Sequence, residues 1–352
     1  MVANKAPRPA GKNSIGTILL KGRTFIALII LSAYFSVFAP NFTTWPSLVL
    51  MLKHASIYGL LAIGMTLVII TGGIDLSVGA LVGLSGMVVG GFLIQGIRIP
   101  FLAATIYPNV PLILLIVCLM AIAIGWISGK LIASVQVPAF IATLGTMYVC
   151  RGFAMLRNNG ATFPNLFGSA ELGNPGFDLI GSAAIPGVNV PYSIIAFLVV
   201  ALAAWFIMKK TPLGNQIYAV GGNERAALLS GIRTKNIKLF VYMFSAFCAA
   251  VCSMIVTSQL RAAHPATGES WEMNAIASVV LGGTSMSGGV GTVGGTVVGT
   301  LVITVLNDGM TMMGVSNFWQ MVIKGVVIVV AVVIDLMQKE MQKRIALQMR
   351  SA

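Results

Sequence analysis

Ten long apolar segments, separated by short polar or glycine-rich stretches, constrain most strongly how this chain can fold. A helix needs about 20 apolar residues to cross the hydrocarbon core of a bilayer. Most of the segments approach or exceed that length, and the eighth is short and weakly apolar. They cover residues 23–40, 47–71, 76–95, 110–134, 138–156, 191–208, 239–260, 272–287, 293–313 and 317–337.

The composition agrees with a membrane environment. Hydrophobic residues make up 57% of the chain and charged residues only 9%, whereas soluble domains carry roughly 25% charged residues. We therefore predict an all-α membrane protein with about ten transmembrane helices. The net charge of +13 does not indicate a nucleic-acid-binding protein, because the basic residues stand at the ends of apolar segments, as in membrane proteins.

The distribution of basic residues predicts the orientation. With the N-terminus in the cytoplasm, ten spans place 16 of the 22 Lys and Arg residues on the cytoplasmic side, which is the side they favour. An odd number of spans would place one basic terminus outside. We expect cytoplasmic tails at 1–24 and 338–352 and one transmembrane domain at 25–337, with a cytoplasmic loop at 209–238 and the protein in the bacterial inner membrane.

The first apolar segment is expected to stay in the protein. Cleavage after Ala39 would leave Pro40 at the first mature position, which signal peptidases disfavour. Many further apolar segments follow, so residues 25–39 are interpreted as a retained transmembrane helix.

Residue types that carry catalysis or bind metals are sparse. The four cysteines lie inside apolar segments without metal-ligand spacing, which favours small buried side chains. Only two histidines are present, and no paired carboxylates or nucleophile with a base can be recognised. We therefore expect no catalytic residue, metal site or bound cofactor in this chain.

Two glycine-rich interruptions resemble each other. Residues 71–79 (TGGIDLSVG) and 281–289 (LGGTSMSGG) each end one apolar segment and open the next. Internal repeats are common in transporters, whose sites lie at interrupted helices. The pattern predicts two internally related halves with interrupted helices.

The polar residues of these interruptions allow two interpretations. Asp75, with Ser77 close by, can cap the following helix, or it can line a polar route through the membrane. Thr284 and Ser285 can likewise line a pathway for an uncharged polar solute, or they can belong to a tight turn. Both interpretations remain open at each interruption.

Glycines recur at helical spacing in the segments that follow. Their periodicity indicates close packing between helices, within the bundle or at a subunit interface, rather than solute binding. They are Gly79, Gly83, Gly86 and Gly90 in one segment, and Gly291, Gly295 and Gly299 in the other.

A short helix is predicted at 223–231 in the cytoplasmic loop. Asn223 can cap it, Glu224 suits its first turn, and Gly231 suits its end. Ala226 and Ala227 would give it a small, smooth face that fits a groove on a partner. An ordinary capped connector is the alternative.

At this point the chain resembles a known family. Residues 222–231 (GNERAALLSG) resemble the coupling segment of permease subunits in ATP-driven (ABC) importers, with Arg225 inserted in the pattern. Residues 62–79, 138–145 and 280–289 resemble ribose-type monosaccharide permeases. The likeness runs in the same order along residues 25–337.

The resemblance implies the permease subunit of a monosaccharide or polyol importer. Its implied partners are a second permease copy, with the pathway at the dimer interface, membrane lipid, a periplasmic sugar-binding protein and a separate cytoplasmic ATPase that holds ATP and Mg. No phosphate-binding Gly-Lys-Ser/Thr loop occurs in this chain. The implied ATPase contact consists of Gly222, Asn223, Glu224, Ala226, Ala227 and Gly231. The implied pathway or gate residues are Asp75, Ser77, Phe140, Thr143, Thr284, Ser285 and Asn307.

Three other functions compete with this one. A branched-chain amino-acid permease belongs to the same broad superfamily. An ion-coupled transporter would rely on Asp75, Asp308 and Lys324 as ionisable groups inside its spans, and would leave the helix at 223–231 unexplained. A membrane enzyme would need the catalytic constellation that the sequence lacks.

Overall fold

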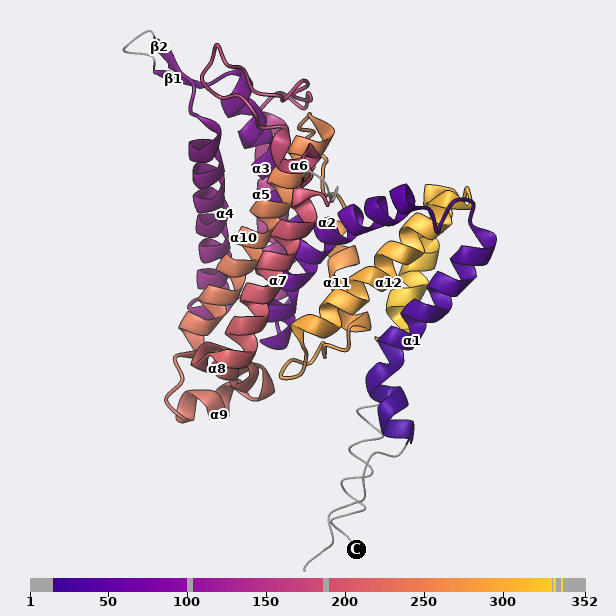
Figure 1. Cartoon of the computed structure of the whole chain (residues 1–352). Helices are drawn as coiled ribbons and strands as arrows, with labels where there is room; N and C mark the ends of the chain where they lie inside the picture. The colour runs from indigo at the N-terminus through magenta and orange to yellow at the C-terminus, as the bar shows by residue number, and fades with distance from the viewer. Residues whose placement is uncertain (1–14, 100–103, 186–189, 331, 334–336, 338–352) are drawn as a thin grey trace, which may run out of the picture.

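The computed structural model describes residues 15–99, 104–185, 190–330, 332–333 and 337. Long helices form the body of the molecule, and several of them are inclined to one another (Figure 1). Each helix matches one predicted apolar segment. They are α1 (Ile15–Phe38), α2 (Trp45–Ile70), α3 (Val78–Ile94), α4 (Val110–Ala133), α5 (Ala139–Leu156), α7 (Tyr192–Lys210), α10 (Thr234–Leu260), α11 (Trp271–Leu281), α12 (Val293–Met312) and a last helix Asn317–Val330.

Six of these helices, within the described residues, are long and apolar enough to cross a membrane by length and composition: α2, α4, α5, α7, α10 and α12. The others are shorter apolar helices. The prediction of a mostly helical, multi-pass membrane protein is confirmed. The number of ten spans remains a prediction.

Several local features differ from the expectation. A small antiparallel hairpin, β1 (Ile97–Ile99) and β2 (Ala104–Ile106), makes the all-α prediction wrong at this point. The short helices α6 (Leu179–Ser182), α8 (Pro212–Gly222) and α9 (Glu224–Leu229) lie in the polar stretches, and of these only α9 was predicted. The N-terminal helix starts at Ile15, before the predicted span. Residues 1–14 and 338–352 of the predicted tails lie outside the described residues.

The eighth segment ends earlier than predicted. Helix α11 stops at Leu281 rather than near residue 287. Gly283 adopts a left-handed backbone conformation, with φ of +87°, which ends a helix readily because glycine has no Cβ.

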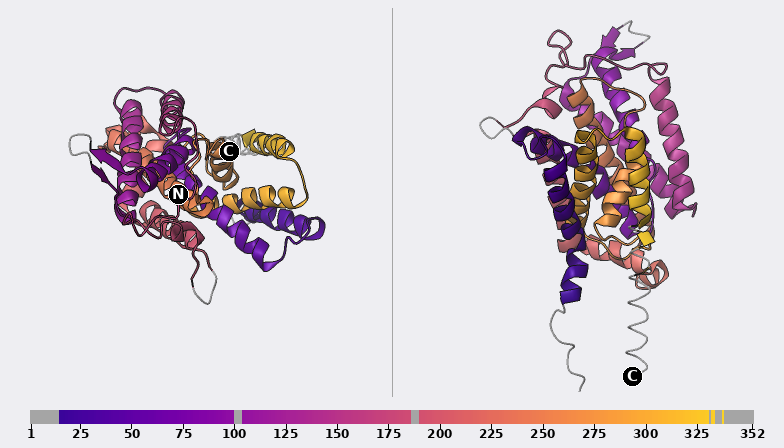
Figure 2. Two further views of the ribbon diagram at one scale, coloured as in Figure 1. Left: turned by 90° about the horizontal axis from the view of Figure 1, so that it is seen from above. Right: turned by 90° about the vertical axis from the view of Figure 1, so that its right-hand side faces the viewer.

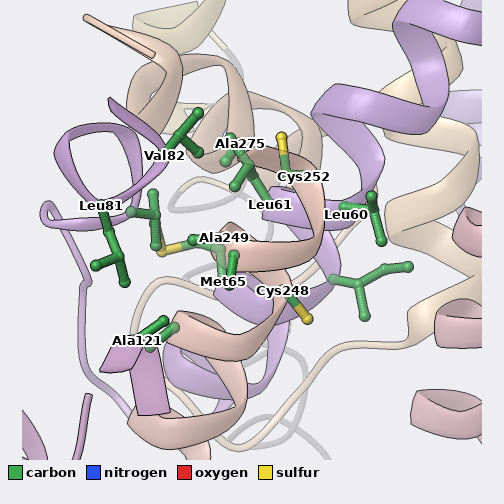
Figure 3. Close-up of a cluster of buried hydrophobic side chains, with 14 of the residues drawn as sticks. Leu60, Leu61, Met65, Leu81, Val82, Ala121, Cys248, Ala249, Cys252 and Ala275 are labelled. Carbon is green, nitrogen blue, oxygen red and sulfur yellow. The ribbon is translucent and has the colours of Figure 1, made fainter. Parts of the chain in front are cut away.

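Helix α10 lies at the centre of the bundle and packs against α2, α3 and α4. Figure 3 shows its small side chains, including Cys248 and Cys252, among the apolar side chains of α2 and α3. The cysteines form no disulfide in the structure, and three of the four are buried. This placement agrees with their predicted role as small buried residues.

Polar groups join the helices at close contacts. The Ser253 hydroxyl on α10 donates to the Val82 carbonyl on α3 at 2.6 Å, and the hydroxyls of Thr66 on α2 and Thr296 on α12 lie 2.6 Å apart. In a bilayer, helices associate through such hydrogen bonds and through small residues, because lipid is as apolar as the side chains.

The two glycine series pack inside the chain. A Cβ on Gly86 would lie 2.7 Å from the Thr257 hydroxyl of α10, and a Cβ on Gly299 would lie 2.7 Å from the Gly282 nitrogen. These contacts support the packing interpretation of both series.

A separate group of helices stands at one side of the bundle, where α1, α12 and Asn317–Val330 share a second apolar cluster around Phe35 and Met310. Figure 2 shows this group beside the main bundle. The His54 imidazole on α2 lies 2.9 Å from the Asp308 carboxylate on α12 and joins the two groups.

Candidate functional site

Helix α9 lies at one end of the bundle, opposite the β hairpin (Figure 1). The Asn223 side-chain oxygen accepts a hydrogen bond from the Ala226 amide at 2.9 Å and so caps the helix. Glu224 stands in the first turn, where the helix dipole favours a negative charge. Gly231 follows the helix with φ of +84°. The predicted helix, its cap and its glycine stop are present.

The surface of α9 differs from the small face expected. Ala227 turns into the apolar core, whereas Ala226 is exposed. Leu228 and Leu229 are 59% and 85% exposed and dominate the outward face. The expectation of a smooth alanine surface is therefore wrong, because Ala227 lies on the buried face of the helix and leucines lie on the exposed face.

An ion pair joins α9 to the central helix. The Lys238 ammonium on α10 lies 2.7 Å from the Glu224 carboxylate. Glu224 is about half exposed, and such pairs contribute about 0.2–1 kcal/mol. The ion pair therefore orients α9 more than it stabilises the fold.

A groove of about 840 Å³ separates α9 from the rest of this end. Its wall comprises the first interruption at Thr71, Gly72 and Gly73 and the connection between α4 and α5. Four basic side chains and one acidic side chain also line it: Arg225, Arg233, Lys235, Lys238 and Glu224. The groove therefore carries a net positive charge and lies directly beside the end of α2.

The first interruption is organised by a buried carboxylate. Asp75 is only 2% exposed. One oxygen accepts from the Ser77 amide at 3.0 Å and the Ser77 hydroxyl at 2.6 Å, and the other accepts from the Ser245 hydroxyl on α10 at 2.8 Å. The residue at the N-cap of α3 is Ser77, whose side chain makes no capping bond. Asp75 therefore ties the turn between α2 and α3 to the central helix.

Thr143 extends this arrangement to α5. Its hydroxyl is buried and lies 2.8 Å from the Ala139 carbonyl of its own helix and 3.2 Å from the Ile74 carbonyl of the first interruption. Phe140, one turn earlier, is 54% exposed. Of these two predicted pathway residues, only Thr143 joins Asp75 and Ser77.

The second interruption lies at the same end of the molecule. Thr284 and Ser285 are buried, and the Thr284 hydroxyl has no hydrogen-bond partner among the described residues. The Ser285 amide donates to the Val290 carbonyl at 2.9 Å and closes the loop. Thr284 and Ser285 therefore lie in a tight turn, and the polar group without a partner among the described residues is the Thr284 hydroxyl.

The two interruptions meet. The Gly289 amide donates to the Ile70 carbonyl at the end of α2 at 2.8 Å. The Tyr218 hydroxyl on α8 donates to the Gly291 carbonyl at 2.7 Å. Burial raises the pKa of the Tyr218 phenol. Helix α8 and both interruptions thus form one contact region.

Asn307 lies apart from this region. It is buried on α12, and its side-chain oxygen has no partner in the described part of the chain. With a rise of about 1.5 Å per residue, it stands roughly 20 Å along α12 from the second interruption. The structure does not bring it together with the other predicted pathway residues.

Several residues of the region follow only from the tertiary structure. Ser245 and Tyr218 are recognised only through their contacts with Asp75 and Gly291. Helix α8 carried a local signal, because Thr211 followed by Pro212 is typical of a helix start. The Thr211 hydroxyl indeed accepts from the Gly214 amide at 3.4 Å.

Within the described residues, no group of three or more His, Cys, Asp or Glu side chains is arranged to hold a metal ion.

The comparisons with known proteins agree with this architecture. A family model described as the permease component of a branched-chain amino acid transport system matches residues 47–332. The ribose import permease of Haemophilus influenzae is 42% identical over 91% of this chain and 94% of its own length. The corresponding permease of Bacillus subtilis is 40% identical over 90% and 93%. No solved structure shows significant similarity.

A more distant relative is the galactose/methyl galactoside import permease of Escherichia coli, which is 34% identical over 92% of this chain and 96% of its own length. These relatives are transporter permeases, and each match spans nearly the whole of both proteins. The chain therefore belongs to this family of transport-system permeases, as a member of the ribose-type monosaccharide import permeases.

Proposed function

We propose that this chain is the membrane-spanning permease subunit of an ATP-driven monosaccharide importer. A periplasmic binding protein delivers the sugar, and a separate cytoplasmic ATPase drives its passage and holds ATP and Mg. The chain itself performs no catalysis and binds no cofactor. Ribose is the first substrate to test, because the ribose permeases share 39–42% identity with this chain, whereas the allose and galactose permeases share 33–35%.

The observation that carries this proposal is the position of α9. A capped helix exposes two leucines, Leu228 and Leu229, at the end of the bundle where both interruptions meet. In the proposed orientation this end faces the cytoplasm. An ATPase that binds these leucines would act directly beside the end of α2.

The distribution of charge supports this orientation. Lys130 at the end of α4, Lys209 and Lys210 at the end of α7, and the basic groove residues all gather at the end that carries α9. The start of α1 reaches the same end, since the Thr24 hydroxyl donates to the Leu281 carbonyl at 2.6 Å. We accordingly propose ten spans with both termini in the cytoplasm.

A second copy of the chain would complete the pathway. Helices α4, α5 and α7 bury only 22–28% of their apolar windows, against 61–67% in α2, α10 and α12. Their outward faces are apolar and suit lipid or a partner copy. Phe140 on α5 would face that interface, whereas Asp75, Ser77, Thr143, Thr284 and Ser285 would act as the gate behind it.

The proposed mechanism follows from this placement. ATP binding closes the ATPase, and the motion displaces α9. The bundle then switches between outward and inward access, which is a change between discrete packed states. The permease needs no tight sugar site, because the binding protein supplies the affinity.

A branched-chain amino-acid permease is the second candidate, and the description of the matching family favours it. Uptake distinguishes the two. Cells that express this chain with its ATPase and binding protein should accumulate labelled ribose, allose or galactose and should not accumulate leucine. Accumulation of leucine without any sugar would replace the sugar assignment.

The docking surface is tested by Leu229→Glu. A charge in place of an apolar anchor should abolish binding, since a few such anchors carry most of the energy of an interface. The ATPase should no longer copurify with the permease. Leu179→Glu, at the opposite end of the molecule, is the matched control and should retain the ATPase. Retention by Leu229→Glu would show that α9 is not the ATPase contact.

The role of Glu224 is tested by a charge exchange with Lys238. Glu224→Lys should weaken both the pair with Lys238 and the ATPase contact. Adding Lys238→Glu restores the pair, and should therefore recover thermal stability without restoring ATPase stimulation. Recovery of both properties would limit Glu224 to holding α9 against α10.

A further inference from the structure

Three segments that are distant in sequence converge on one carbonyl oxygen. The Ile70 carbonyl ends α2, immediately before the first interruption, and accepts the Gly289 amide of the second interruption at 2.8 Å. The last turn of α8 covers the same carbonyl. The Ile70 oxygen stands where the Cβ of any larger residue at position 221 would lie.

The contact is made by main chain alone. A Cβ on Gly221 would also lie 2.6 Å from the Gly289 nitrogen. A Cβ on Gly288 would lie 2.8 Å from the Gly221 carbonyl and 3.1 Å from the Gly72 nitrogen. The glycines at 221, 288 and 289 thus allow the three backbones to touch without side chains between them.

This contact is directly connected to α9. Gly221 stands two residues before Asn223, the only residue between α8 and α9. Helix α8 is itself anchored by its buried side chains Ile217 and Val220 and by the Tyr218 hydroxyl. A displacement of α9 therefore reaches Gly221 through less than one helical turn.

We propose that Gly221 is the positioning residue that transmits the displacement of α9 to both helix interruptions at once. The inference rests on the proposed function, in which α9 is the part moved by the ATPase. Side chains in contact can absorb a small shift by changing rotamer, but adjoining backbones cannot. Close-packed interiors also transmit strain. The junction therefore moves the end of α2 and the loop at 282–292 together.

The test compares two glycines at the same end of the complete transporter. Gly221→Ala places a methyl group against the Ile70 carbonyl, whereas Gly294→Ala, in the first turn of α12, meets nothing within 4 Å. The permease is reconstituted in proteoliposomes with its ATPase and sugar-loaded binding protein. Copurification of the ATPase, ATP hydrolysis and sugar uptake are measured in parallel.

For Gly221→Ala we expect normal copurification and basal ATP hydrolysis, with sugar transported per ATP reduced about tenfold, within the range that coupling between distant sites spans. Gly294→Ala should transport like the unmodified protein. Normal coupling in Gly221→Ala, with the complex assembled, would overturn the inference. An equal loss in both variants would also overturn it.

A second variant decides the matter if Gly221→Ala does not accumulate in the membrane. Tyr218→Phe removes the hydroxyl that holds α8 to the second interruption and keeps the ring. It should lower sugar transported per ATP by about fivefold, near the lower limit of such coupling. Tyr192→Phe, at the opposite end of the bundle, is the control. Unchanged coupling in Tyr218→Phe would contradict the inference.

These outcomes are separable from a failure of the proposed function. If α9 does not bind the ATPase, Leu229→Glu retains the ATPase whatever happens at Gly221. If only the transmission is wrong, Leu229→Glu loses the ATPase and Gly221→Ala stays coupled.

Discussion

The two interruptions leave their helices in the same way. After α2, the Gly72 amide donates to the Ile69 carbonyl at 2.9 Å and the Gly73 amide to the Val68 carbonyl at 3.1 Å. After α11, the Gly283 and Thr284 amides make the equivalent bonds at 2.9 and 3.1 Å. Gly72 and Gly283 have positive φ, of +82° and +87°, as in the Schellman helix end. This match supports the proposal of two internally related halves.

Beyond these helix ends, the two turns are held differently. The first contains Asp75, whose carboxylate fixes it to Ser245 on the central helix. The second, residues 282–292, contains no carboxylate and touches its neighbours through the Gly289 amide and the Gly291 carbonyl. The same type of helix end can therefore lead into a turn fixed by a buried carboxylate or into a turn held by main-chain contacts. We expect the first turn to move together with the central helix through Asp75, and the second to move with the end of α2 through the Gly289 amide.

The largest expected effect comes from Asp75→Ala. This change leaves the buried donors of Ser77 and Ser245 without their acceptor, which should lower the free energy of unfolding by about 3 kcal/mol. Thermal unfolding in detergent measures the loss, and sugar uptake should fall with it. Asp178→Ala is the control, because its carboxylate pairs with Arg261 at 3.4 Å near the surface. Equal losses of stability in Asp75→Ala and Asp178→Ala would show that Asp75 does not hold the first turn more strongly than a surface ion pair would.

The shared helix ends predict equal effects at two glycines. Gly72→Ala and Gly283→Ala each force a side chain into the left-handed region and should each cost about 1–2 kcal/mol. Gly294→Ala is the control, because it has open space in the first turn of α12. Thermal unfolding of the three variants gives the comparison. A cost confined to one of the two glycines would break the proposed equivalence of the turns.

The smallest effects distinguish the hydroxyls of the two turns. Ser245→Ala removes a donor to Asp75 and should cost about 1 kcal/mol. Thr284→Val removes a buried hydroxyl without a partner in the described residues, and should leave stability unchanged or slightly raised. Both are measured by thermal unfolding. A larger loss for Thr284→Val would show that its hydroxyl is bound, by solute or water, in the working protein.

Much of this fold could be predicted from local patterns. The apolar segments located the long helices because each helix satisfies its own backbone hydrogen bonds. Asn223 and Gly231 marked both ends of α9 because caps act within a few residues. The glycine pairs marked both interruptions for the same reason. The early end of α11 was missed because the polar loop after Gly283 continues a run of small residues that a helix would also tolerate.

The candidate site was only partly predictable. The family resemblance implies Thr143, Asp75 and Ser77 as pathway residues, and the structure brings the three together. It also implies Asn307, which lies apart from them. Neither the contact of Asp75 with Ser245 nor that of Tyr218 with Gly291 follows from sequence, because each joins residues more than 70 positions apart.

The sequence by itself determined that the chain is a multi-helix membrane protein, where its helices are interrupted, and that α9 is a capped helix. Only the tertiary structure decided which face of α9 is outward and that Gly221, Ile70 and Gly289 meet. The physical reason is the solvent. In water, apolar side chains mark the buried face of a helix, but in a bilayer the lipid is equally apolar. Hydrophobicity therefore locates each helix and does not determine its neighbours, which are set by small residues and a few polar contacts.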